Sequence, residues 1–403
     1  MEYIIIGGGA AGLFAAARLS AKGEKVTLLE RNDKCGKKLR ITGKGRCNLT
    51  NNCTREEFFA NIVTNPKFLY SAYDNFTAQD TMAYFEALGV PLKTERGNRV
   101  FPVSDKAGDI VAALLGECEK NGVLNKQFKV SGIITENDTA KGITDGNEKL
   151  FADKIVIATG GKSYPATGSD GNGYRLAEAL GIKINPPSPS LVPIVCAENY
   201  CREMSGLSLK NVKLSVLANG KTVFSEQGEM MFTEFGTTGP LVLSASAHIK
   251  DIGKTKLSTK LLIDLKPALD NKTLDTRILR DFAENPNRAF HNALDKLLPS
   301  SMRPVMVALS GIAPEKQVNA VTKEERLKLL SLLKDFPLTP ISFRSIDEAV
   351  ITRGGVDVRE INPKNMESKK IKNLFFAGEI IDVDAYTGGF NLQIAWSTGA
   401  AIG

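Results

Sequence analysis

The chain has 403 residues, with 52 Lys and Arg, 45 Asp and Glu, and 2 His. Apolar residues make up 42% and charged residues 24% of the chain, which excludes a disordered or fibrous protein. The net charge of +7 fits an anionic ligand but falls short of a nucleic-acid-binding signature, and two histidines argue against a His-rich metal site. The length predicts two or three domains.

The chain shows no export signal and no run of 18 apolar residues, so neither secretion nor a membrane span is expected. Its six cysteines are scattered through a large chain. We therefore expect a cytoplasmic protein with reduced thiols and no metal.

The first elements predict a compact βαβ unit. Glu2–Ile6 is a continuous apolar strand, Leu13–Lys22 has the apolar face of a helix and ends at Gly23, and Lys25–Leu29 is a second buried strand. Further helices are predicted at four places: Arg55–Phe59, Phe68–Asn75, Ala78–Leu88 and Ala107–Lys120. An antiparallel meander is predicted from three short alternating runs: Phe128–Thr135, Lys141–Thr144 and Lys149–Ala152. Another buried strand is predicted at Lys154–Ala158.

The second half begins at a proline cluster. Four prolines (Pro186, Pro187, Pro189 and Pro193) predict a stiff connector and a domain boundary. Antiparallel β-structure follows, with a two-residue turn at Asn219-Gly220 and a strand at Leu257–Leu265. From Pro267 to about Asp335 the pattern is helical in short pieces, with apolar residues every fourth position in Leu274–Phe282 and Phe290–Leu298. Asn373–Ala377 predicts a last strand.

A glycine turn joins the first strand to the first helix. In the GxGxxG motif that starts at Gly7, Gly7 permits the tight turn, Gly9 allows the backbone to approach a diphosphate, and Gly12 allows close packing of helix and strand. Glu30 ends the second strand, where it can accept hydrogen bonds from a ribose. This arrangement predicts a site for NAD(P) or FAD.

Two later segments favour FAD. Ile155–Ala158 leads into the small residues Thr159-Gly160-Gly161, and Leu374–Ala377 leads into Gly378-Glu379 and then a glycine pair before a helix. A late return of the chain can close over the ribityl chain and the isoalloxazine ring, and a helix N-terminus can stabilise charge on the reduced ring.

These segments resemble those of a bacterial FAD-dependent oxidoreductase family with a glutathione-reductase-like FAD fold. Branches of the family include aminoacetone oxidase and a bile-acid-inducible 3-dehydro-bile acid reductase. The resemblance covers nearly the whole chain, and its most specific segments are Arg46-Cys47-Asn48, Asp382-Val383-Asp384 and Thr387-Gly388-Gly389. The chain departs from the family at Glu234, where a His is frequent, and at Ala385, where Gly is usual.

The resemblance implies an α/β architecture in which a Rossmann-like FAD-binding domain carries an inserted β-barrel-like domain and a helical subdomain. With the boundaries read from composition, we expect the FAD-binding domain at 1–190 and 346–403. The inserted antiparallel β domain is expected at 191–265 and 337–345, and the helical subdomain at 266–336.

The basic segment Lys34–Arg46 contains six Lys and Arg and no acid. Some of these charges are expected to neutralise the FAD diphosphate or to attract an anionic substrate or NADPH. Lys34 and Lys37 also fit a solvated surface. RNA binding is a third interpretation of the segment. The predicted cofactor contacts span both ends of the chain: Gly7, Gly9, Ala11, Gly12, Glu30, Arg31, Lys38, Gly45, Arg46, Asn48, Val130, Thr159, Gly160, Gly378, Glu379, Gly389, Phe390, Asn391 and Leu392.

The expected function is an FAD-dependent oxidoreductase that passes a hydride through flavin N5 and reduces a small unsaturated or ketonic substrate with NAD(P)H. An oxygen-dependent amine oxidase of the aminoacetone type is an alternative, and a flavin- or nucleotide-binding protein that acts on RNA or as a sensor is a third. Candidate catalytic residues are Arg46, Cys47, Glu234 and Tyr386, although Cys47 also fits a buried inert thiol. A small-molecule partner is expected, without nucleic acid or membrane, and the sequence does not predict the oligomeric state.

Overall fold

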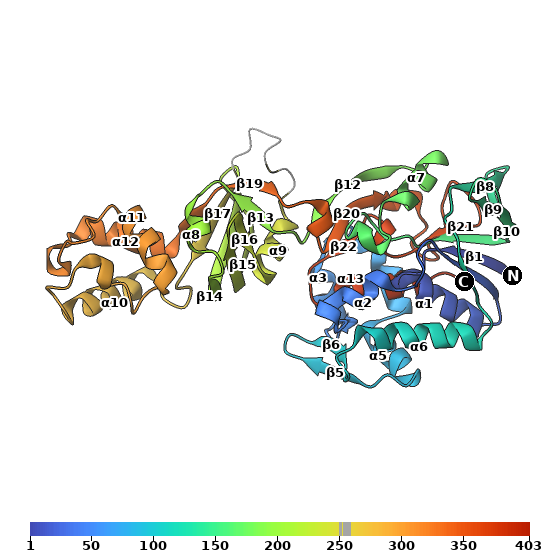
Figure 1. The fold of residues 1–403 in the computed structure, drawn as a ribbon, viewed down its shortest axis with the longest axis horizontal. Helices are drawn as coiled ribbons and strands as arrows, with labels where there is room; N and C mark the ends of the chain where they lie inside the picture. The colour runs from blue at the N-terminus through green and yellow to red at the C-terminus, as the bar shows by residue number, and fades with distance from the viewer. Residues whose placement is uncertain (250–251, 253–258) are drawn as a thin grey trace. The chain divides into compact units, whose positions relative to one another are not determined.

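The structure is a computed structural model that describes residues 1–249, 252 and 259–403. The chain divides into two compact units, the first formed by Met1–Ser190 with Ile346–Gly403 and the second by Leu191–Ser345. The first unit is therefore built from both ends of the chain, and both termini lie in it (Figure 1).

A five-stranded parallel sheet forms the centre of the first unit. Its strand order is β21-β11-β1-β2-β7, and all neighbouring strands are parallel. The bounds are Glu2–Ile6 (β1), Lys25–Glu30 (β2), Leu124–Gln127 (β7), Lys154–Ile157 (β11) and Leu374–Phe376 (β21). The residues of β1, β11 and β21 are mostly apolar and buried because helices and smaller sheets cover them, as is usual for parallel sheets, whereas the edge strand β7 is mostly polar and exposed. The predicted α/β, Rossmann-like fold class is confirmed.

Helices from the two ends of the chain pack together beside this sheet. Helix α1 (Ala10–Ala21) contacts both α6 (Ala107–Lys120) and α13 (Phe390–Ala400). The rings of Phe14 and Trp396 lie 5.4 Å apart, and the buried indole of Trp396 donates to the Leu49 carbonyl at 2.8 Å. Burying these aromatic side chains holds the carboxyl-terminal helix against the glycine-turn helix.

Short helices and small sheets complete the first unit. The helices are Lys37–Ile41 (α2), Arg55–Ala60 (α3), Tyr70–Asn75 (α4), Ala78–Ala87 (α5) and Asn172–Ala179 (α7). A three-stranded antiparallel sheet comprises Gly132–Glu136 (β8), Thr139–Thr144 (β9) and Lys149–Phe151 (β10), and another comprises Thr50–Asn51 (β3), Leu92–Glu95 (β5) and Arg99–Pro102 (β6). Ile62–Thr64 (β4) pairs with Asp384–Ala385 (β22). The predicted meander therefore forms, but its first strand starts at Gly132 rather than at Phe128.

The proline cluster, predicted as a stiff connector and a domain boundary, is mostly part of a strand, and the two compact units divide within it, after Ser190. Most of it lies in β12 (Ile184–Ser190), which pairs antiparallel with β20 (Ile351–Val356). The register breaks between Asn185 and Ser188, so Pro186 and Pro187 occupy an irregularity where no ladder donor is needed. Both strands are edge strands of a two-stranded sheet, which is where a sheet tolerates proline.

A seven-stranded antiparallel sheet forms the second unit, in the order β18-β17-β14-β15-β16-β13-β19. Its bounds are Ile194–Cys196 (β13), Ser208–Ala218 (β14), Lys221–Thr233 (β15), Gly236–Thr238 (β16), Thr259–Asp264 (β17), Phe336–Leu338 (β18) and Pro340–Phe343 (β19). The predicted turn at Asn219-Gly220 joins β14 to β15, with positive φ at both residues. The predicted start of a strand at Leu257 lies outside the described residues.

Helices in the second unit are Tyr200–Glu203 (α8), Pro240–Ser246 (α9), Asn271–Ala283 (α10), Arg303–Ser310 (α11) and Lys323–Lys334 (α12). The predicted helical segment Phe290–Leu298 is instead one short 3-10 turn, Phe290–Asn292, followed by turns. Phe290, Leu294 and Leu298 are all buried. The apolar spacing therefore indicated buried residues, although it did not indicate a helix.

Candidate functional site

The glycine turn closes tightly at two of its glycines. Gly7 has φ +106°, and a Cβ there would lie 2.5 Å from the Ala158 carbonyl oxygen. A Cβ on Gly12 would lie 1.9 Å from the Gly7 carbonyl oxygen. Side chains at these positions would push α1 away from the ends of β1 and β11. The structure therefore uses Gly7 and Gly12 for close packing.

Gly9 faces open space. A Cβ on Gly9 would meet no atom of the described residues within 4 Å, and no side chain caps this end of α1. The first backbone N–H groups of a helix have no partner inside the helix, and together with the helix dipole they favour an anion. This space suits a diphosphate.

The acid at the end of β2 is anchored to the turn. Glu30 Oε2 accepts a hydrogen bond from the Gly8 N–H at 2.9 Å, and Oε1 accepts from the backbone and side chain of Asn32 at 2.9 and 2.8 Å. A carboxylate has further lone pairs, so Glu30 can also accept from a ribose hydroxyl. Arg31 is paired with Asp170, and the Val130 carbonyl accepts from Asn172 at 3.0 Å; contact of these two residues with a cofactor stays a prediction.

The segment after β11 contains an unsatisfied polar atom. Thr159 Oγ1 is buried and has no hydrogen-bond partner in the described chain, and the next residue, Gly160, has φ +73°. The Oδ1 atom of Asn48 is likewise buried without a partner. Buried polar atoms are rarely left unpaired in a native protein. Both positions were predicted to contact FAD, and both atoms fit a role in hydrogen bonding to it.

A polar cluster links α2 with the carboxyl-terminal segment. Lys38 Nζ donates to Glu379 Oε2 at 2.7 Å and to Ser163 Oγ at 2.7 Å. Glu379 Oε1 accepts from Ser163 Oγ at 3.0 Å and from the Thr352 N–H at 2.9 Å. Ser163 and Thr352 were not among the predicted site residues, because their contacts with Glu379 join segments that lie far apart in the sequence.

The Lys38–Glu379 pair should stabilise the first unit. Its side chains are 21% and 15% exposed, so water screens the attraction only partly. We expect Lys38→Met and Glu379→Gln each to lower the free energy of unfolding, with a coupling of about 1 kcal/mol in a double-mutant cycle measured by urea denaturation. The Lys25–Glu2 pair, whose side chains are 79% and 44% exposed, is the matched control and should show no measurable coupling. Additive effects at Lys38 and Glu379 would contradict the pairing.

The loop before α13 is held by backbone contacts. Gly389 has φ +100°, and a Cβ there would lie 2.3 Å from the Thr50 carbonyl oxygen. Asn51 Nδ2 donates to the Gly388 carbonyl at 2.9 Å, and the Asn391 side chain bonds both the N–H and the carbonyl of Ala385 at 3.0 and 2.8 Å. Gly378 packs against Ala11, because a Cβ on Gly378 would lie 2.8 Å from the Ala11 Cβ.

The side chains of Phe390, Asn391 and Leu392 are used inside the protein. Phe390 is buried with its ring 6.0 Å from that of Phe58, and Leu392 packs against the core. Any cofactor contact from these residues would therefore come from the backbone at the start of α13. This helix has 11 residues, and its N-terminus follows two glycines.

The Arg46 guanidinium, which was predicted to contact FAD, already binds two carboxylates of the protein. Arg46 bonds Glu95 at 2.5 Å and Asp105 at 2.6 Å, and it lies 4.1 Å from the Phe101 ring centroid. The two carboxylates raise the pKa of Arg46 and already balance its charge. Gly45, by contrast, has φ +86° and faces open space, so the backbone here is accessible to a ligand.

Cys47 is a buried thiol. It is 0% exposed with φ +58°, and burial raises its pKa to about 12. Because the thiolate is the reactive form, this position argues against acid–base or nucleophilic chemistry at Cys47. We expect no alkylation of Cys47 by iodoacetamide at pH 8 in the native protein, and full alkylation in urea, by peptide mass spectrometry. Labelling in the native state would contradict its burial.

The other two catalytic candidates lie in different units. The Tyr386 N–H donates to the Asn61 carbonyl at 3.0 Å in the first unit, and its side chain is half-buried. Glu234 is exposed in the turn between β15 and β16 of the second unit. Their catalytic roles stay predictions.

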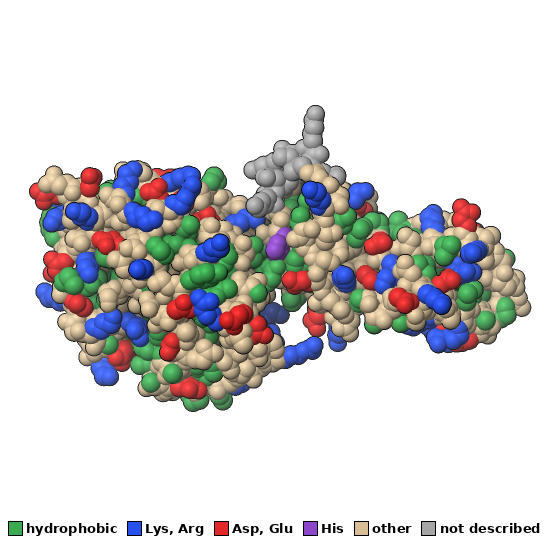
Figure 2. Space-filling model, turned by 180° about the vertical axis from the view of Figure 1, so that it is seen from behind, with side chains coloured by type: hydrophobic (Ala, Val, Ile, Leu, Met, Phe, Trp, Pro, Cys, Tyr) green, Lys and Arg blue, Asp and Glu red, His purple; other side chains and the backbone are tan. Residues whose placement is uncertain are grey.

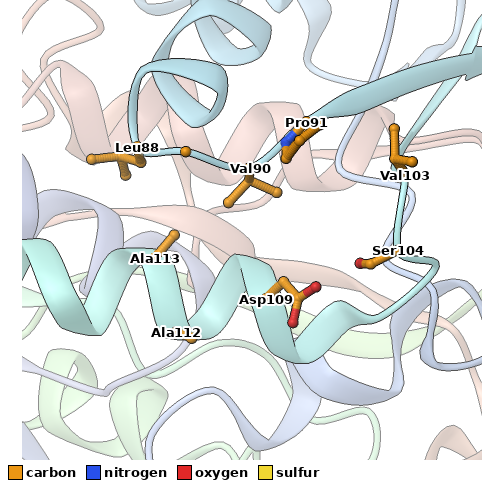
Figure 3. A pocket seen from close by; sticks show the side chains of 9 residues that line it. Leu88, Val90, Pro91, Val103, Ser104, Asp109, Ala112 and Ala113 are labelled. Carbon is orange, nitrogen blue, oxygen red and sulfur yellow. The ribbon is translucent and has the colours of Figure 1, made fainter.

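A pocket of about 550 Å³ is lined by none of the predicted site residues. Figure 3 shows its wall formed by the end of α5, the segment Val90-Pro91, the residues after β6 and one side of α6. Its lining is mostly apolar, with Asp109 and Ser104 as the polar side chains, and it includes none of the predicted cofactor contacts. In the described part of the chain, no helix is long and apolar enough to cross a membrane, and no group of His, Cys, Asp and Glu is arranged to hold a metal.

Comparisons with known proteins show what the whole chain is similar to. The family model described as HI0933-like protein Rossmann domain matches residues 1–403. A ribosomal RNA dihydrouridine synthase of Escherichia coli is 31% identical, with 98% of this chain and 96% of that protein covered. A 3-dehydro-bile acid delta(4,6)-reductase of Clostridium scindens is 30% identical over 99% of this chain and 97% of that protein. The solved 3-ketosteroid-delta4-(5alpha)-dehydrogenase of Rhodococcus jostii has the same fold, with a TM-score of 0.52 at 14% identity, covering 100% and 97% of the two chains.

Proposed function

Because this chain belongs to the HI0933-like Rossmann family, we propose that it saturates a carbon–carbon double bond conjugated with a carbonyl group. The chain is an FAD-dependent oxidoreductase, as its relatives are. The proposal concerns its substrate and the source of its electrons.

The names of two relatives carry the proposal. Dihydrouridine is uridine with two added hydrogens on a double bond conjugated with a carbonyl, and a delta(4,6)-reductase of a 3-dehydro compound acts on double bonds conjugated with a ketone. Both relatives align with almost the whole of this chain. The common chemistry is the addition of a hydride and a proton to an electron-poor double bond, which is the reaction we propose here.

The residues of the first unit suit FAD in an extended form. The open space at Gly9 and the free N–H groups of α1 would hold the diphosphate, and Glu30 would accept from the ribose. Glu379, fixed by Lys38, Ser163 and the Thr352 N–H, would accept from a ribityl hydroxyl. The N-terminus of α13 would favour negative charge on the ring. FAD, when bound, supplies hydride transfer through its N5 atom.

A nicotinamide nucleotide is the proposed hydride donor. The dinucleotide-binding turn of this proposal is the GxGxxG turn between β1 and α1. The later glycines Gly168, Gly171 and Gly173 do not form a second one, because in the described residues a 3-10 turn, and not a sheet strand, directly precedes them. The donor would therefore dock transiently against the bound cofactor rather than occupy a second Rossmann domain.

RNA is a second candidate substrate, because two proteins of similar length at 31% identity are named ribosomal RNA dihydrouridine synthases. The basic segment gives it limited support: Lys37 pairs with Asp33, Lys38 with Glu379, and Arg46 with Glu95 and Asp105. On the face shown in Figure 2, basic and acidic side chains alternate over both units. A small unsaturated carbonyl compound therefore remains the first choice.

Anaerobic stopped-flow spectroscopy tests the proposal. NADPH or NADH should bleach the flavin bands, and a 3-oxo-4-ene steroid should restore them, with the saturated ketone found by mass spectrometry. Restoration by a uridine-containing RNA but not by the steroid would identify RNA as the substrate instead. Rapid bleaching by a primary amine without any nicotinamide would contradict the proposal and favour an amine oxidase.

A further inference from the structure

Two buried aspartates lie just before the loop that leads into α13. Asp382 is 7% exposed and Asp384 is 0% exposed. Asp384 belongs to β22, where it pairs with Thr64 of β4, and Asn391 clamps the next residue, Ala385, through its N–H and carbonyl. Asp384 is thus fixed to the segment that would face the cofactor.

The surroundings of the two carboxyl groups differ. Asp382 Oδ2 accepts from Asn185 Nδ2 at 2.7 Å and from Asn65 Nδ2 at 3.3 Å, and its Oδ1 accepts from the Gly354 N–H at 3.1 Å. Both oxygens therefore have donors, as a buried carboxylate needs.

Asp384 has a hydrogen bond at one oxygen only. Its Oδ2 accepts from Ser190 Oγ at 2.6 Å, while its Oδ1 has no hydrogen-bond partner in the described chain. Burial raises the pKa of Asp384, and the nearby Asp382 charge raises it further. The hydroxyl groups of Ser190 and Thr64 and the charge of Arg353 on β20 act in the opposite direction without outweighing burial. Helix α13 carries no charged residue.

An asparagine, which has the same shape and no charge, would destabilise the fold less than the aspartate does at position 384. Burying a carboxyl group with an unpaired oxygen destabilises a fold, since the group must either stay protonated or carry an uncompensated charge. A carboxyl group that burial keeps protonated is a common source of an acid in an enzyme site. The chain keeps an acid at position 384 beside the segment predicted to contact the flavin.

We propose that Asp384 is the acid that supplies the proton when the double bond is reduced, an inference that rests on the proposed function. A hydride adds to the carbon β to the carbonyl group. The O–H bond at Asp384 Oδ1 then breaks, and the proton forms a C–H bond at the α carbon. The substrate gains two electrons and two hydrogens, and the remaining carboxylate recovers a proton from water.

The test compares Asp384→Asn with Asp382→Asn in the holoenzyme. We expect Asp384→Asn to bind FAD and to be bleached by NADPH as the wild type is, but to be reoxidised by the 3-oxo-4-ene steroid at least about 100-fold more slowly. A neutral side chain also removes the cost of the buried acid. The melting temperature of Asp384→Asn should therefore exceed that of the wild type by about 3 °C at pH 8, with the difference growing as pH rises from about 4. Asp382→Asn should instead melt at a lower temperature, because one of its two acceptor oxygens becomes an NH2 group that faces a donor.

Each result has a distinct meaning. Reoxidation of Asp384→Asn at the wild-type rate would overturn the proton-donor role while leaving the proposed function intact. A lower melting temperature for Asp384→Asn at every pH would show that Asp384 is a structural carboxylate and would also overturn the role. If neither the steroid nor a uridine-containing RNA reoxidises the wild type, the proposed function fails, and the melting temperatures still decide whether Asp384 is a neutral acid.

Discussion

Gly9→Val should give a folded protein that has lost its flavin. A Cβ on Gly9 meets no atom within 4 Å in the described chain, so the valine side chain should not strain the fold. It would instead fill the space in front of the α1 N–H groups, where the diphosphate of FAD must approach the backbone. We expect the dissociation constant for FAD to rise at least about 100-fold, which corresponds to about 2.8 kcal/mol.

Titration of the apoprotein with FAD, followed by flavin fluorescence, measures this effect. Gly116→Val is the matched control, because Gly116 in α6 also faces open space and lies outside the predicted site. The control should bind FAD as the wild type does. Stoichiometric FAD in purified Gly9→Val would show that the diphosphate lies elsewhere.

Gly389→Ala should destabilise the first unit and also release the flavin. Gly389 combines φ +100° with a Cβ position 2.3 Å from the Thr50 carbonyl oxygen, so alanine would meet both backbone strain and a clash with backbone that cannot rotate away. The start of α13 would have to move from the Thr50–Asn51 strand. We expect the free energy of unfolding to fall by about 3 kcal/mol in urea denaturation.

Gly122→Ala separates the two causes. Gly122 has φ +72° but a Cβ there would meet nothing within 4 Å, so alanine adds strain without a clash. We expect a loss of about 1 kcal/mol and normal FAD binding for this control. Equal losses in the two variants would contradict the close approach of the carboxyl-terminal loop to Thr50.

Local patterns predicted much of the fold. The glycine turn, the continuous apolar strands and the turn at Asn219-Gly220 each depend on a few neighbouring residues, and α6 spans the predicted range Ala107–Lys120. Local patterns of this kind do not indicate which strand pairs with a strand far away in the sequence. The prolines of β12 sit in a strand only because β20, over 150 residues later, pairs with them around a bulge.

The candidate site shows the same limit. The sequence predicted Glu30 and Glu379 because each follows a strand, and Lys38 because it lies in the basic segment. It did not show that Ser163 joins Lys38 to Glu379, or that Glu95 and Asp105 engage Arg46, since these partners come from separate segments. The burial of Cys47 and the unpaired oxygen of Asp384 depend on tertiary packing, which no short motif encodes.

We expect the amino-terminal glycine turn and the carboxyl-terminal segment to bind the two halves of one FAD molecule. A crystal structure of the protein with FAD tests it most directly. We expect one FAD per chain, with its diphosphate at Gly9 and its ring against the Gly388–Gly389 end of α13. A flavin whose ring lies away from α13, or a protein that takes up no FAD at saturating concentration, would contradict it.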